Sequence, residues 1–172
     1  MSTNKRELKT LIVYESKYGC TEKCAQLIQE KIKNTEIVNV KNAPEDIGFY
    51  DTIIIGGSIY MGKIQRQIKA FCRRHVKVLA KKRMGLFICC MFTGEKAKQQ
   101  LINSFPKELT EVAIAKDCFG GEISYNKMKL LDRIIIKLVT KSPESEIPKL
   151  DKQNNASNLS IEKIDYFVST LL

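Results

Sequence analysis

The stretch Leu8–Thr21, LKTLIVYESKYGCT, combines an apolar strand with a small turn that is rich in hydroxyl groups. Its run Leu11–Val13 is continuously apolar, which is typical of a parallel strand covered on both faces. After the turn, apolar residues recur at helical spacing from Cys24 to Ile32. The sequence therefore predicts a strand, a tight turn and a helix in direct succession.

The turn supplies groups that suit a phosphate. Ser16 and Thr21 carry hydroxyls, and Gly19 has no Cβ. The first backbone N–H groups of a helix lack internal partners, and the helix dipole places partial positive charge there. We therefore expect an anion site at this junction, the simpler alternative being that Gly19 is an ordinary turn glycine.

Length and composition favour one domain spanning residues 1–172. The chain is 44% hydrophobic, which is enough to bury a sizeable core. Met1–Thr10 has no apolar segment of the signal-peptide kind, and no apolar run approaches the ~18 residues of a membrane span. We expect a soluble, cytoplasmic protein.

The formal net charge is +10, which bears on partners rather than on fold. A basic protein attracts nucleic acid, an anionic membrane surface or an acidic small molecule. Nucleic acid is disfavoured, because the lysines are spread along the chain and no zinc-finger, RNA-recognition or helix-turn-helix signature accompanies them. We expect a membrane surface or an acidic ligand instead.

The cysteines lie mostly inside apolar patterns, with no CxxC pair. Buried reduced thiols are favoured over metal ligands or disulfides. The only histidine, His75, falls on an apolar helical face, which favours a core residue over a proton carrier. The six cysteines are Cys20, Cys24, Cys72, Cys89, Cys90 and Cys118.

Strand and helix patterns alternate along the rest of the chain. The further strands are predicted at Glu36–Val40, Asp51–Gly57, Met84–Phe92 and Val112–Phe119. The further helices are predicted at Gln65–Lys81, Lys96–Ser104, Lys127–Lys141 and Ser160–Leu172, with a polar loop at Ser142–Ser157. This alternation predicts a doubly wound α/β fold, a five-stranded parallel sheet with helices on both faces.

In such sheets, ligands bind beyond the carboxyl ends of the strands. The loops at those ends are Ser16–Thr21, Gly56–Gly62, Thr93-Gly94 and Gly120-Gly121. Each contains glycine, and we expect them to converge on one site.

The predicted helix 127–141 is basic as well as amphipathic. Its cations Lys129, Arg133, Lys137 and Lys141 are spaced by four residues. Beside these cations lies an apolar face of Leu131, Ile134, Ile135 and Leu138. In the last helix, the residues predicted to face inward are Ile161, Ile164, Phe167, Val168 and Leu171. A solvated face and attraction to anionic lipid or to an acidic small molecule both explain the cations.

The turn SKYGCT resembles the T/S-x-T-G-x-T loop of the flavodoxin family, with Tyr18 in place of the middle hydroxyl. GGSIYMG, at Gly56–Gly62, resembles the loop that flanks the flavin ring in that family. The resemblance implies strand order 2-1-3-4-5 and FMN as cofactor. It implies phosphate contacts from Ser16, Lys17, Tyr18, Gly19, Cys20 and Thr21. Beside the ring it implies Ser58, Ile59, Tyr60, Met61 and Gly62, with Phe92, Thr93, Gly94 and Gly121 on the other side.

Within that ring-flanking loop, Tyr60 either stacks on the flavin or is an exposed loop aromatic. FMN itself accepts a hydride or single electrons, so no side-chain acid or base is obligatory.

Three stretches resemble the menaquinone-dependent protoporphyrinogen oxidase branch more closely: the turn at 16–21, Gly56–His75 and Phe119–Lys141. This resemblance implies oxidation of protoporphyrinogen IX, an acidic tetrapyrrole, with a quinone acceptor at the inner face of the membrane. The segment Thr93–Glu111 departs from that branch because it is short. The alternatives are a flavodoxin that shuttles electrons between redox partner proteins, and an NAD(P)H-linked quinone or flavin reductase.

Overall fold

Five parallel strands form the centre of the computed structural model, which describes residues 7–141 and 147–172. The strands are β1 Thr10–Glu15, β2 Thr35–Asn39, β3 Thr52–Tyr60, β5 Arg83–Cys89 and β6 Ala115–Cys118. They lie in the order β2-β1-β3-β5-β6. Counting only these strands in sequence, the order is 2-1-3-4-5, so the predicted fold is confirmed.

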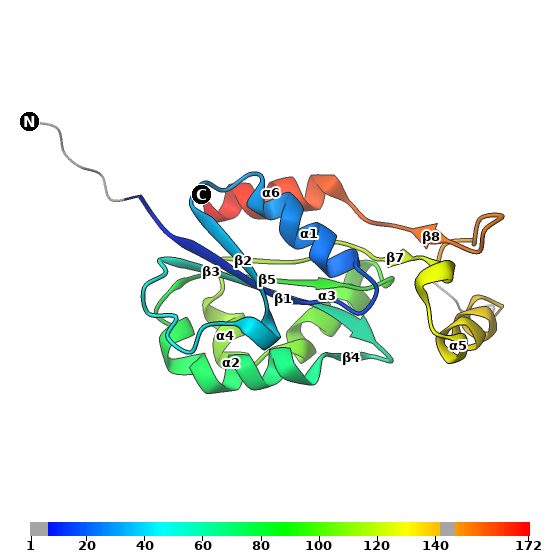
Figure 1. Cartoon of the computed structure of the whole chain (residues 1–172), viewed down its shortest axis with the longest axis horizontal. Coiled ribbons are helices and arrows are strands. Elements are labelled where there is room, and N and C mark those ends of the chain that lie inside the picture. Colours follow the sequence, from blue (N-terminus) through cyan, green and yellow to red (C-terminus); the bar gives the residue numbers. More distant parts are fainter. Residues whose placement is uncertain (1–6, 142–146) are drawn as a thin grey trace, which may run out of the picture.

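Helices cover both faces of the sheet (Figure 1). One face carries α1 Cys20–Gln29 and α6 Ile161–Leu171, and the other carries α2 Arg66–Leu79, α3 Gly94–Ser104 and α4 Lys107–Val112. The short α4 was not predicted, because the chain resumes a helix directly after Pro106, its N-terminal cap. Within the described residues, no helix has the length and apolar character needed to cross a bilayer.

Alternate residues of each central strand feed two separate cores. In β3, Ile54 packs toward α1 and α6, whereas Ile53 and Ile55 pack toward α2, and all three are fully buried. A strand covered on both faces needs apolar residues at every position, which explains its run of isoleucines.

One short antiparallel pair extends the parallel sheet, and a second forms a separate two-stranded sheet. β4 Lys63–Ile64 folds back on the end of β3, and β7 Glu122–Ile123 pairs with β8 Ala156–Ser157. β8 falls in the segment predicted as a loop, of which residues 142–146 lie outside the described residues. Two-residue strands give too short a pattern to be recognised from sequence.

The basic helix predicted over 127–141 leaves most of its apolar face exposed. The helix α5 Leu130–Thr140 leaves Leu131 74% and Leu138 67% exposed, and Ile134 is also exposed. The reason is its position: α5 lies outside both helical layers, at the end of the molecule where β7 and β8 lie (Figure 1).

The prediction that the last helix faces inward with five apolar residues fails at the start of α6. Ile161, the first residue of that helix, is exposed, whereas the other residues predicted to face inward are buried.

Candidate functional site

A cavity of about 490 Å³ opens at the carboxyl edge of the sheet, where the glycine-containing loops meet α5. A recess of about 690 Å³ lies at the amino ends of β1 and β2, but doubly wound sheets bind ligands at the carboxyl edge. The predicted site residues that line the carboxyl-edge cavity are Ser16, Lys17, Tyr18, Cys20, Ser58, Ile59, Tyr60, Met61, Gly62, Phe92 and Gly121. Gly19, Thr21, Thr93 and Gly94 do not line it.

The turn between β1 and α1 is shaped as an anion site. Gly19 adopts φ +95°, a left-handed conformation that favours glycine, and its N–H donates to Ser16 Oγ at 2.9 Å. The helix begins at Cys20 without a side-chain cap. The first N–H groups of α1 therefore keep their capacity to bind an anion.

The Thr21 hydroxyl, in the first turn of α1, lacks a partner. Among residues 7–141 and 147–172, its Oγ1 is the one buried side-chain nitrogen or oxygen without a hydrogen bond. An unsatisfied buried hydroxyl costs about 1–3 kcal/mol, so such a group is usually explained by a role. A phosphate at the helix terminus would supply the missing acceptor, and the residues of the turn fit such a group.

The loop after β3 is a tight hairpin. Met61 and Gly62 both have positive φ, 48° and 73°, as a two-residue turn between β3 and β4 requires. Gln65 holds the start of this loop, because its Oε1 accepts the N–H of Ser58 at 3.1 Å and its Nε2 donates to Ser58 Oγ. The hairpin therefore presents Tyr60 to the cavity from a fixed base.

Asp132 of α5 is the centre of a polar cluster in the cavity. The hydroxyls of Tyr18 and Tyr60 both donate to its carboxylate, and Lys17 Nζ lies 2.9 Å from its Oδ2. The same ammonium lies 3.1 Å from the centroid of the Tyr60 ring, a cation–π contact. One carboxylate thus joins the turn, the β3–β4 hairpin and α5.

These donors keep Asp132 ionised. Burial by itself raises the pKa of this carboxyl, but hydrogen bonds from Tyr18, Tyr60 and Lys17 outweigh it and lower the pKa to about 2. For Lys17, burial lowers the pKa, and the bond to Asp132 reverses this to give a raised value. The pair is therefore an ion pair at neutral pH.

Asn158 secures the opposite wall of the cavity. Its Oδ1 accepts the N–H of Gly121 at 2.7 Å, and its Nδ2 donates to the carbonyl of Met91 at 3.1 Å. Gly120 has φ +86°, and a Cβ there would lie 2.1 Å from the Asn158 carbonyl oxygen. This close approach explains the glycine and fixes the loops after β5 and β6 against each other.

Sequence reasoning missed about half of the cavity wall. The additional residues are Cys89, Cys90, Met91, Glu122, Ile123, Met128, Asp132, Ile135, Ile136, Val139 and Ile147. A signal for the α5 residues exists, because Asp132, Ile135, Ile136 and Val139 are spaced to share one helical face. An acidic residue on such a face indicates a partner beneath it.

A family model described as a flavodoxin domain matches residues 11–147. The chain belongs to this flavodoxin family. A search of curated proteins gives no match.

Solved structures similar to this flavodoxin-family chain include the two-electron reduced flavodoxin of Megasphaera elsdenii, at 21% identity and a TM-score of 0.52, over 63% of this chain and 84% of that one. An archaeal flavodoxin is 16% identical over 64% and 83%, with a TM-score of 0.49. A Lactobacillus acidophilus flavoprotein, solved in complex with FMN, is 22% identical over 64% and 93%, with a TM-score of 0.48. The first of these shares the fold of this chain.

Proposed function

We propose that this flavodoxin-family chain binds FMN at the carboxyl-edge cavity and acts as an FMN-dependent oxidoreductase. The observation that carries the proposal is the unpartnered Thr21 hydroxyl beside the uncapped start of α1, which suits the phosphate of a flavin nucleotide. When bound, FMN supplies hydride or single-electron transfer.

Different residues of the chain would contact the phosphate and the ring of the cofactor. The first N–H groups of α1, the hydroxyls of Ser16 and Thr21, and the Lys17 ammonium suit the phosphate. The hairpin from Ser58 to Gly62 suits one side of the ring, and the loops that Asn158 holds together suit the other. Because Lys17 pairs with Asp132, a phosphate would compete with that carboxylate for the ammonium.

The apolar wall supplied by α5 favours an enzyme over an electron carrier. Ile135, Ile136 and Val139 line the cavity together with Met128, which gives the cavity an apolar wall against which an apolar substrate could pack. A carrier needs only an accessible ring edge for its partner protein. Membership of the flavodoxin family favours the carrier as the second candidate.

For the substrate we propose protoporphyrinogen IX, with a quinone as electron acceptor. An apolar macrocycle with carboxylates suits an apolar cavity in a chain of net charge +10. Quinones reside in membranes. The helix α5 exposes apolar residues such as Leu131 and Leu138, and its C-terminal cap Lys141 exposes a cation. We therefore propose that α5 contacts the anionic inner face of the membrane.

The cofactor proposal is tested by FMN affinity. Ser16→Ala combined with Thr21→Ala removes two candidate donors, and FMN retention is expected to weaken by about 1–3 kcal/mol for each hydroxyl that contacts the phosphate. Thr110→Ala is the matched control, because its hydroxyl bonds to the Lys107 carbonyl away from the cavity. Equal FMN affinity in all three proteins, measured by flavin fluorescence, would contradict the phosphate assignment.

The reaction is tested by turnover of FMN-loaded protein. The enzyme proposal predicts anaerobic oxidation of protoporphyrinogen IX with a menaquinone analogue. Electron uptake from a flavodoxin reductase without that turnover would favour the carrier instead. NAD(P)H-dependent reduction of quinone in the same preparation would indicate a nicotinamide-linked reductase.

A further inference from the structure

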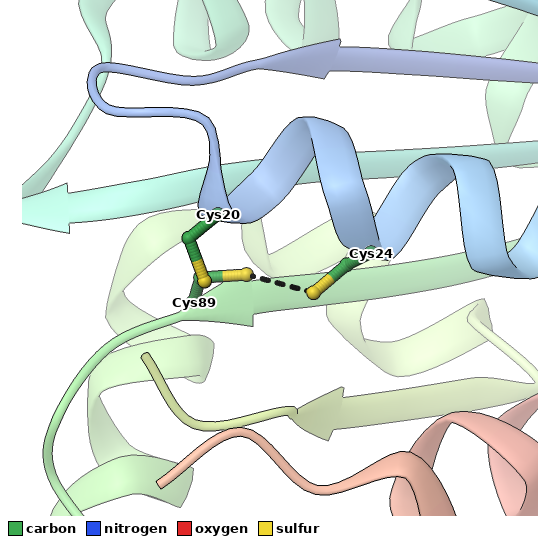
Figure 2. A group of neighbouring side chains, drawn as sticks. All are labelled: Cys20, Cys24 and Cys89. Atoms are coloured by element: carbon green, nitrogen blue, oxygen red, sulfur yellow. Dashed lines mark hydrogen bonds between the residues drawn. The ribbon is translucent and has the colours of Figure 1, made fainter. Parts of the chain in front are cut away.

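Three cysteine thiols meet beside the cavity (Figure 2). Cys20 and Cys24 lie one turn apart on the inner side of α1, and Cys89 is the last residue of β5. Their Sγ atoms all lie within 4.8 Å of one another, and those of Cys24 and Cys89 are 3.5 Å apart. All three residues are buried and free of disulfides, so three sulfur ligands converge on one point.

The spacing suits a metal ion bound by three thiolates. Metal–sulfur bonds of about 2.3 Å place the sulfurs of a planar three-coordinate site about 4 Å apart. In the described part of the chain, the group contains no histidine or carboxylate. Thiolates bind both Cu(I) and zinc, but structural zinc almost always takes four protein ligands, one more than this group supplies.

The surroundings disfavour a hard, hydrated cation. The thiols lie in the apolar core that includes Ile12, Phe87 and Phe119, a region that excludes water and hard cations. Cys20 is the first residue of α1, where the helix dipole stabilises a thiolate. Cys20 and Cys89 also line the cavity, which gives an ion a route to the site.

A second cysteine pair in the same structure lacks this arrangement. The Sγ atoms of Cys90 and Cys118 lie 3.2 Å apart, but this pair offers only two sulfur ligands. Cys72 lies in the separate core on the opposite face of the sheet. The three-sulfur group is therefore distinct from the other buried thiols.

We propose that Cys20, Cys24 and Cys89 form a trithiolate site for Cu(I). Three S–Cu bonds form as three thiol protons leave to solvent, and copper remains in its +1 state throughout. The site uses the Cys20 side chain, so it is separate from the backbone N–H groups at the start of α1 that suit a phosphate. It goes beyond the proposed flavin function and does not depend on it.

The test is a titration of the reduced, FMN-free chain with Cu(I) under anaerobic conditions, against the competing chelator bathocuproine disulfonate. We expect one tightly held Cu(I) per chain, with three sulfur neighbours at about 2.3 Å in X-ray absorption spectra. Cys24→Ala is expected to lower the affinity of the chain for Cu(I) at least about tenfold. The matched controls Cys72→Ala and Cys118→Ala should retain the affinity of the unchanged chain.

Three results would overturn the proposal. One is an X-ray absorption spectrum of the unchanged chain with fewer than three sulfur neighbours around copper. This result does not depend on whether any variant folds. Another is equal Cu(I) affinity in Cys24→Ala and Cys72→Ala, both checked for native far-ultraviolet circular dichroism. Tighter binding of Zn²⁺ than of Cu(I) would also contradict the assignment, because it requires a fourth ligand.

Discussion

The helices α2 and α5 have similar sequence patterns, but the apolar face is buried in α2 and exposed in α5. Both carry basic residues beside an apolar face, and that pattern predicts a helix packed on a sheet. In α2 the face is buried, with Ile68, Cys72 and Leu79 fully enclosed. In α5 the predicted face points outward, and the buried position is Asp132. Periodicity thus predicts a helix but does not identify the surface that covers it.

The two helices are also held by different forces. Apolar contact with the sheet holds α2, whereas a carboxylate with two hydroxyl donors and an ammonium holds α5 over the cavity. Apolar burial is insensitive to pH and salt over a wide range, and an ion-pair cluster depends on both. The attachment of α5 can therefore change while the sheet stays folded.

The largest expected difference is in stability. Ile68→Ala in α2 removes a fully buried side chain and should lower the free energy of unfolding by about 2–5 kcal/mol. Leu138→Ala in α5 removes an exposed one and should change it by less than about 0.5 kcal/mol. Urea unfolding followed by circular dichroism measures both, and a comparable loss in Leu138→Ala would mean that α5 packs its apolar face on the protein.

Removing the charge of Asp132 should release α5 alone. Hydrogen bonds to a charged group contribute about 1.5–3 kcal/mol, so Asp132→Asn should raise amide exchange in residues 130–140 and leave α2 protected. Asp165→Asn is the matched control, because that carboxylate of α6 pairs at the surface with Lys31, which follows α1. Unchanged exchange in α5 would show that apolar contacts hold the helix instead.

The strands could be predicted from sequence because each is specified by a run of adjacent residues. Runs such as Leu11–Val13 and the isoleucines of β3 are apolar at every position, and alternation with helices leaves few topologies. The turn at 16–21 could also be placed, since its residues are contiguous. The missing hydrogen-bond partner of the Thr21 hydroxyl could not be predicted, because the neighbours of a buried atom come from the whole fold.

The remaining parts depend on contacts between distant residues. Asp132 meets Tyr18 and Tyr60 across 114 and 72 positions, and no spacing rule connects them. Asn158 occupies a polar segment that resembles any loop, and only the fold brings it to Gly121. The meeting of Cys89 with the cysteines of α1 likewise requires the pairing order of the sheet.

Acid should destabilise the attachments of α2 and α5 in different pH ranges. The pKa of Asp132 is lowered to about 2 from an ordinary 3.8, so its contribution is complete above about pH 4 and is lost as pH falls toward 2. On α2, burial first and then Arg74 lower the pKa of His75 from 6.5, with Glu45 opposing them. The contribution of a neutral His75 is therefore complete above that value and declines below it.

Exchange measured across a pH series checks this order. In native chain, α2 should begin to lose protection below about pH 6.5, and α5 should respond only below about pH 4. His75→Gln removes the first response and should leave the second. Loss of α5 protection in step with α2 would indicate one cooperative unit rather than two differently held helices.

The smallest expected effect concerns membranes and uses the exposed face of α5. A cation near an anionic bilayer contributes about 1 kcal/mol, so Lys141→Gln should reduce association with phosphatidylserine vesicles about fivefold. Lys77→Gln in α2 is the matched control, because it removes the same charge from a helix whose apolar face is already covered by the sheet. Equal reductions would assign the attraction to net charge alone, whereas an effect confined to α5 requires its uncovered leucines and cations to act together.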